Sequence, residues 1–100
     1  MSGEEQLKTE FEKCVKLVNS SKPGSVELSN TDKLKFYAIF KQATVGDCTG
    51  ARPSMVNLIA RYKYDAWKKL TDSKINKQLA MQMFIDEFKK ISPPEIIAKL

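Results

Sequence analysis

Apolar residues recur every three or four positions in four stretches of this sequence, with charged and polar residues between them. The stretches are residues 4–19, 31–45, 56–70 and 74–91. In the first, for example, Leu7, Phe11 and Val18 share one face of a helix. The alternating pattern of a half-buried strand is absent from the sequence. The pattern therefore predicts an all-α domain of four helices.

Residues that interrupt helices separate these stretches. The segment "NSSKPGS" (19–25) combines Ser, Pro and Gly, and Pro93 and Pro94 follow the last stretch. Before the second helix, Ser29, Asn30 and Thr31 are candidate N-caps. Gly46 is placed to end that helix, because glycine takes the left-handed conformation without strain. Residues 47–55 then read as an irregular loop.

The charge of the chain points to an anionic partner. The 17 Lys and Arg residues outnumber the 12 Asp and Glu residues, which gives a net charge of +5 in a chain of 100 residues. Nucleic acid, a phospholipid surface and a phosphorylated small molecule all fit this excess. Composition does not distinguish among these three anionic partners.

The residues needed for several kinds of chemistry are missing. There is no histidine, and Cys14 and Cys48 lie far apart with no Cys-x-x-Cys spacing, so we expect no metal site, no disulfide framework and no cofactor. The sequence has no histidine and no paired carboxylate cluster near the basic residues, so an enzyme is the least favoured hypothesis. No apolar run reaches the roughly 18 residues of a membrane span, and the N-terminus lacks the apolar core of a signal peptide. We expect a soluble, intracellular protein without stable membrane insertion.

The second helix is apolar on nearly every side, which is unusual in so small a domain. Tyr37 and Lys41 are one turn apart and border an apolar strip with Leu34 and Ala38. Such a face suits a ligand that is part anion and part hydrocarbon. Alternatively, Tyr37 is a residue at the rim of the core and Lys41 a solvated charge.

A second cluster, "RYKYDAWKKL" (61–70), interleaves basic and aromatic residues. This composition is typical of surfaces that bind nucleic acid or a nucleotide-bearing small molecule. Trp67 adjoins Ala66 on the apolar face, which favours a place in the core.

Four segments together resemble the acyl-CoA-binding protein family: "KLKFYAIFKQATVGD" (33–47), "RPSM" (52–55), "KYDAWKKL" (63–70) and "AMQMFIDEF" (80–88). The resemblance covers about residues 7–91. It implies a four-helix up-down-down-up bundle, a domain over residues 4–92 and a short C-terminal tail over residues 93–100. It also implies non-enzymatic binding of one medium- to long-chain fatty acyl-CoA ester.

The resemblance also implies roles for particular residues. Tyr37 and Lys41 match ligand-contacting residues of the family, and Lys63 matches the lysine that meets the 3′-phosphate of CoA. Ala38, Ile39 and Phe40 lie in the ligand-lining stretch. The remaining implied contacts are Leu34 on the acyl chain, Phe84 on the fourth helix, and Asn19, with Lys16 as a substitute.

This sequence departs from the family pattern at several of these places. Phe40 and Phe84 stand where the family usually has tyrosine, which keeps the ring and loses a hydroxyl. Ile59 replaces a lysine of many members, and Tyr64 replaces a tryptophan. We therefore expect retained binding with altered affinity or chain-length preference.

The alternatives to a cytoplasmic carrier are a small basic nucleic-acid-binding domain and a protein-interaction module. We expect a monomer with acyl-CoA-using enzymes as transient partners. The final tripeptide, Ala98-Lys99-Leu100, resembles a peroxisomal address on an exposed tail, so a peroxisomal location is the alternative to the cytoplasm.

Overall fold

The protein is described by a computed structural model that covers residues 3–19 and 28–98. Its helices are α1 (Gly3–Val18), α2 (Asn30–Thr44), α3 (Leu58–Asp72), α4 (Lys77–Ile91) and the single turn α5 (Pro94–Ile97). No strand occurs in this part of the chain. The all-α fold predicted from the sequence is confirmed.

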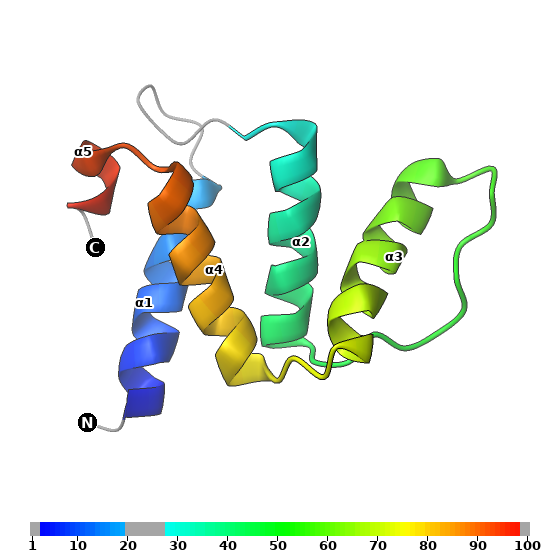
Figure 1. Ribbon diagram of the computed structural model, residues 1–100, viewed down its shortest axis with the longest axis horizontal. Helices are drawn as coiled ribbons and strands as arrows, with labels where there is room; N and C mark the ends of the chain where they lie inside the picture. Colours follow the sequence, from blue (N-terminus) through cyan, green and yellow to red (C-terminus); the bar gives the residue numbers. More distant parts are fainter. Residues whose placement is uncertain (1–2, 20–27, 99–100) are drawn as a thin grey trace.

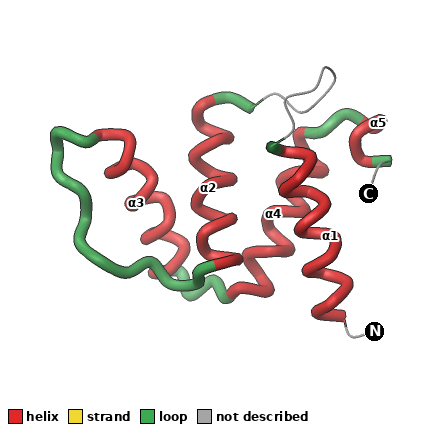
Figure 2. The backbone as a smooth tube through the Cα atoms, turned by 180° about the vertical axis from the view of Figure 1, so that it is seen from behind, coloured by secondary structure: helices red, strands yellow, loops and turns green. Residues whose placement is uncertain are grey.

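The four long helices run up, down, down and up (Figure 1). α2 and α3 are parallel because residues 45–57 carry the chain back along the length of the bundle before α3 begins, which is clearest from behind (Figure 2). α2 contacts both α3 and α4, whereas α1 packs on α4. The molecule measures 41 × 34 × 16 Å and is thus flat, with α3 at one end of it.

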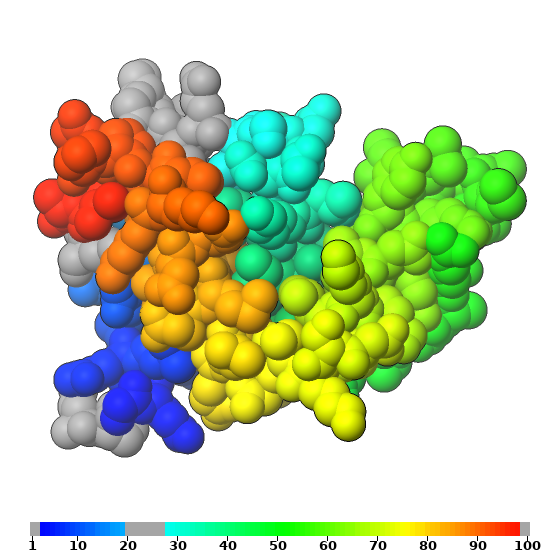
Figure 3. All heavy atoms as spheres, in the orientation of Figure 1, coloured from blue at the N-terminus to red at the C-terminus, as the bar shows by residue number. Residues whose placement is uncertain are grey.

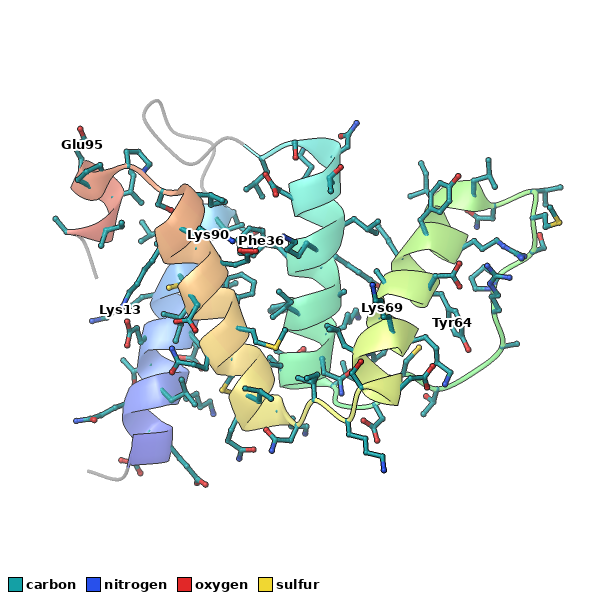
Figure 4. All side chains as sticks on the ribbon, in the orientation of Figure 1. Lys13, Phe36, Tyr64, Lys69, Lys90 and Glu95 are labelled. Atoms are coloured by element: carbon teal, nitrogen blue, oxygen red, sulfur yellow. The ribbon has the colours of Figure 1, made fainter. Side chains whose placement is uncertain are left out.

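The core is built around interlocking aromatic rings. The ring of Phe84 packs edge-to-face on Phe11 and on Phe36, with centroid distances of 5.1 and 4.9 Å. Figure 4 shows Phe36 between α2 and α4. Phe88 is fully buried in the same core. Cys14 also lies there, and burial raises the pKa of its thiol to about 11. α3 contributes no fully buried side chain to this core.

Side chains at the helix starts accept backbone hydrogen bonds. Ser29 accepts from the amide of Asp32, as predicted for the second helix. Asn57 and Asn76 do the same for α3 and α4, so these helices begin two to three residues later than the sequence pattern predicted. Gly46 has φ 99° directly after α2, which confirms its predicted role at the helix end.

A buried polar network ties the end of α2 to α3. Gln42 is buried, and its side-chain amide donates to the Ile75 carbonyl at 2.6 Å and to Asp47 at 3.2 Å. The Thr71 hydroxyl donates to Gln42 and accepts from the amide of Cys48. These bonds help to hold α3 against the end of α2.

One expectation from the sequence is wrong, and another holds only in part. Ala38 and Ile39 were expected to leave apolar surface uncovered, but each is only 3% exposed, because α2 lies between α3 and α4. The tail expected after Pro93 forms the single turn α5, whose Ile96 is buried in the core, while Pro93, Pro94, Glu95 and Ala98 are exposed as expected.

Some expectations fall outside the described residues. These are the break at 19–25 from residue 20 onward, and Lys99 and Leu100 of the tripeptide. The domain limits at 4 and 92 stay a prediction, although Ile96 belongs to the same core as the four long helices.

Candidate functional site

Tyr37 lies between two lysines supplied by different helices. The Nζ of Lys63 on α3 is 5.1 Å from the centroid of the Tyr37 ring, and the Nζ of Lys41 is 5.8 Å from the same centroid. Lys41 is also 5.8 Å from the centroid of the Trp67 ring. Cation–π attraction holds both ammonium groups near the phenol.

These two ammonium groups are free to bind an anion. Within residues 3–19 and 28–98, the ion pairs join other residues, and neither Lys41 nor Lys63 has a carboxylate partner. Two unpaired lysines converging on one ring form a site for a phosphate or another anion, because charge-assisted hydrogen bonds to phosphate oxygens are strong.

Trp67 holds this arrangement in place but is not a member of the core cluster. Its indole N–H donates to the Gly46 carbonyl at 2.8 Å, and the side chain is half-buried. The prediction that Trp67 anchors the core is therefore wrong. The residue instead fastens α3 to the end of α2 and flanks Lys41.

A pocket of about 720 Å³ opens beside Tyr37; we call it the Tyr37 pocket. It is bounded by parts of α1, α2, α3 and α4. Its described lining residues are Val15, Val18, Asn19, Leu28, Lys33, Phe36, Tyr37, Phe40, Lys63 and Phe84. Most of these described residues are apolar, the charged ones are both lysines, and no carboxylate is among them.

Two other pockets differ in charge. One of about 510 Å³, the Lys69 pocket, lies between α2, α3 and α4, and its charged lining residues are Lys35, Lys69, Lys90, Asp86 and Glu87. Figure 4 shows Lys69 between α3 and α2. Another, of about 570 Å³, lies between α1, α2 and α4, and its charged lining residues are Lys8, Lys16, Lys77 and Glu12. Of these three pockets, the Tyr37 pocket is the one whose described lining holds lysines and no carboxylate, so no negative charge in that lining opposes an anion.

The structure brings together part of the predicted site. Asn19, Tyr37, Phe40, Lys63 and Phe84 all line the Tyr37 pocket, and Lys41 adjoins it through Tyr37.

The other predicted contacts lie elsewhere. Ala38 and Ile39 line the Lys69 pocket on the other side of α2. Leu34 is half-buried and lines none of the three pockets. As ligand contacts, all nine residues remain predictions.

The sequence reasoning missed several residues of the Tyr37 pocket. Lys33 precedes Tyr37 by one helical turn, so the spacing that linked Tyr37 to Lys41 also offered this second lysine. The apolar members Val15, Val18 and Leu28 gave no such signal, because their place in the pocket depends on how α1 meets α2.

Comparison with known proteins agrees with this architecture. The sequence pattern of the family described as "Acyl CoA binding protein" matches residues 8–88. The chain belongs to the acyl-CoA-binding protein family. The resemblance seen in the sequence is thus confirmed.

Named relatives bear out the membership. Acyl-CoA-binding domain-containing protein 5 of Xenopus laevis is 46% identical over 84 residues, which are 83% of this chain and 18% of the relative. Human acyl-CoA-binding domain-containing protein 4 is 37% identical over 92 residues, 91% of this chain and 34% of the relative. The chain thus spans between about a sixth and a third of the length of these relatives.

Solved structures of the family share the fold. The crystal structure of Oryza sativa acyl-CoA-binding protein 2 superimposes with a TM-score of 0.74 at 39% identity, over 85% of this chain and 89% of that one. The acyl-CoA-binding protein of Moniliophthora perniciosa gives 0.77 at 33% identity, over 99% and 94%. The up-down-down-up bundle is the fold of this family.

Proposed function

We propose that this chain is a non-enzymatic binding and carrier protein for medium- to long-chain fatty acyl-CoA esters, and that the Tyr37 pocket holds the ligand. The observation that carries the proposal is the composition of that pocket, whose described wall combines two lysines with apolar side chains and no carboxylate. An acyl-CoA ester matches it, because the ester is phosphorylated at one end and hydrocarbon at the other. Membership of the family supports the same ligand.

The lysines around Tyr37 take the phosphates. Lys63 binds the 3′-phosphate of CoA, as the family resemblance implies, and Lys41 supplies a second ammonium group from α2. Lys33 lines the same pocket and adds a third cation that the sequence analysis did not consider. The Tyr37 hydroxyl donates a hydrogen bond to the ligand while its ring keeps Lys41 and Lys63 in place.

Apolar walls shelter the uncharged parts of the ligand. The half-buried Phe40 and the buried Phe84 line the pocket, and Asn19 offers a polar side chain where α1 ends. Ala38 and Ile39 are covered by neighbouring helices and are not available to the acyl tail as the structure stands. Leu34, one turn before Ala38, is half-buried and is therefore the most accessible residue of the predicted acyl strip.

The competing functions have less support. The basic and aromatic segment 61–70 suggested binding of nucleic acid. However, Tyr64 donates a hydrogen bond to the Gly50 carbonyl, and Trp67 donates one to the Gly46 carbonyl. Two of its rings are therefore engaged in holding loops and not free to stack on bases. We propose a monomer that meets acyl-CoA-using enzymes only transiently.

Isothermal titration calorimetry tests the function. A long-chain acyl-CoA ester should bind one to one, free CoA far more weakly, and free fatty acid hardly at all, because the acid lacks the phosphates. Each added methylene that the protein covers should contribute up to about 0.8 kcal/mol, until the tail outruns the covered surface. Affinity independent of chain length would contradict the carrier, and tight binding of free fatty acid would indicate a general lipid-binding bundle.

A further inference from the structure

The exposed apolar side chains of this protein are concentrated at one end of it. Seven large apolar residues are exposed in the described part of the chain, and five of them fall within residues 55–62. We call four of these, Met55, Val56, Leu58 and Ile59, the apolar tip. Val56 is 96% exposed and Met55 72%, values that leave almost the whole side chain in water. Contiguous exposed apolar residues of this kind mark a surface that meets a partner.

The tip projects from the molecule. It comprises the end of the loop between α2 and α3 and the first residues of α3. Figure 3 shows these residues, in green, at the outer end of the long axis, far from α1 and α5. A protruding apolar edge can enter a soft surface without a matching cavity in its partner.

The loop that carries the tip is held in a fixed shape. The Arg52 guanidinium donates to both oxygens of Asp65, at 2.8 and 2.6 Å, and this pairing lowers the pKa of the Asp65 carboxyl. Tyr64, which Figure 4 shows on the side of α3 that faces the loop, donates to the Gly50 carbonyl at 3.1 Å. Arg61 donates to the Pro53 carbonyl at 3.3 Å. The apolar side chains are thus displayed by a bonded loop.

Within residues 48–64, which include the tip, the charged side chains are all basic. Residues 48–64 contain Arg52, Arg61 and Lys63 and no Asp or Glu. Arg52 is paired with Asp65, but Arg61 and Lys63 have no carboxylate partner among the described residues. Apolar side chains flanked by unpaired cations are the combination that favours an anionic bilayer surface.

We propose that the apolar tip docks on the surface of an anionic phospholipid bilayer, with Met55, Val56, Leu58 and Ile59 in the headgroup region and Arg61 against lipid phosphates. The docking is peripheral, since no helix in the described residues is long and apolar enough to cross a membrane. Lys63 is one turn from Ile59 and lines the Tyr37 pocket, so a docked molecule holds that pocket near the lipid. A role in exchanging acyl-CoA with the bilayer rests on the proposed function; the docking does not.

Co-sedimentation with vesicles tests the docking without any acyl-CoA. The full chain should sediment with vesicles of equimolar phosphatidylcholine and phosphatidylserine and far less with phosphatidylcholine alone. Each basic residue near such a surface contributes about fivefold to the partition coefficient, so added salt should weaken the binding steeply. Equal sedimentation with both vesicle types, or none with either, would overturn the proposal.

Matched variants locate the surface. Leu58→Glu and Leu79→Glu change the same residue type at similar exposure, 51% and 47%, and alter the net charge equally. Leu79 lies in the first turn of α4, at the other end of the bundle from the tip. We expect Leu58→Glu and Val56→Glu to reduce vesicle binding at least about tenfold. Leu79→Glu should reduce it only about fivefold, which is the effect of one charge near the surface.

Other partners for the tip give different results. If Leu58→Glu and Leu79→Glu reduce vesicle binding equally, general charge and not the tip attracts the bilayer, and the proposal is wrong. It is equally wrong if Val56→Glu abolishes a concentration-dependent dimer in sedimentation velocity while vesicle binding is unchanged. Weakened acyl-CoA binding with unchanged vesicle binding would assign the tip to the ligand's own tail.

Discussion

Replacing Lys63 by alanine should weaken binding of a long-chain acyl-CoA ester. Lys63 is exposed in the wall of the Tyr37 pocket, with its Nζ 5.1 Å from the Tyr37 ring centroid and no carboxylate partner among the described residues. A hydrogen bond between charged groups contributes about 1.5–3 kcal/mol, which corresponds to a roughly 10- to 150-fold change in Kd. Solvent screens an exposed lysine, so we expect a value near the lower end.

Lys69→Ala is the matched control for this variant. Lys69 is an exposed lysine on the same helix, so the two substitutions remove the same charge and the same side chain. Lys69 lines the Lys69 pocket instead of the Tyr37 pocket. In titration calorimetry its replacement should leave the Kd for the ester close to that of the unchanged protein.

The 3′-phosphate itself supplies the second half of the test. With a 3′-dephospho acyl-CoA ester, the loss caused by Lys63→Ala should largely disappear, because the phosphate that Lys63 binds is missing. Equal losses with both esters would refute the assignment of Lys63 to that phosphate. Equal losses for Lys63→Ala and Lys69→Ala would show that only the overall charge matters, and would refute the placement of the ligand in the Tyr37 pocket.

Three further predictions follow from neighbouring contacts. Tyr37→Phe should weaken ester binding by about 0.5–1.5 kcal/mol through one lost hydrogen bond, and Tyr37→Ala should weaken it further, because the ring that holds two lysines is gone; equal effects in calorimetry would contradict this. Phe40→Tyr should keep the melting temperature, because Phe40 is half-buried and borders the Tyr37 pocket, whereas Phe84→Tyr should lose about 1–3 kcal/mol of unfolding free energy by overpacking, because Phe84 is 2% exposed in the aromatic core; equal destabilisation would place Phe40 in the core as well. Gln42→Leu should destabilise the fold by about 1–3 kcal/mol in urea unfolding, because the Thr71 hydroxyl and the Ile75 carbonyl lose their partner; an unchanged midpoint would refute this role of the network.

Local signals in the sequence predicted the fold well. Ser29 and Gly46 sit where the chain enters and leaves α2, and each acts through its own backbone or its nearest neighbours. The starts of α3 and α4 were misplaced because apolar spacing was followed past Asn57 and Asn76, whose side chains cap those helices. Both caps are also local, and closer attention to asparagine would have found them.

Non-local contacts account for what the sequence did not predict. A helix that is apolar on nearly every side was taken to have one face left over for a ligand, whereas α2 is covered by α3 and α4 on the face of Ala38 and Ile39. The bonds of Gln42 reach residues 29 and 33 positions away, and no spacing rule predicts them. The family resemblance supplied Lys63, which spacing on α2 alone could not connect to Tyr37.

The central claim is that the Tyr37 pocket, and not the Lys69 pocket, holds the CoA end of an acyl-CoA ester. Titration of ¹⁵N-labelled protein with a long-chain ester, followed by amide chemical shifts, tests it most directly. We predict saturation at one equivalent, with the largest changes at Asn19, Lys33, Tyr37 and Lys63. Changes concentrated at Lys69, Leu70 and Met83, or no saturation at all, would contradict the account.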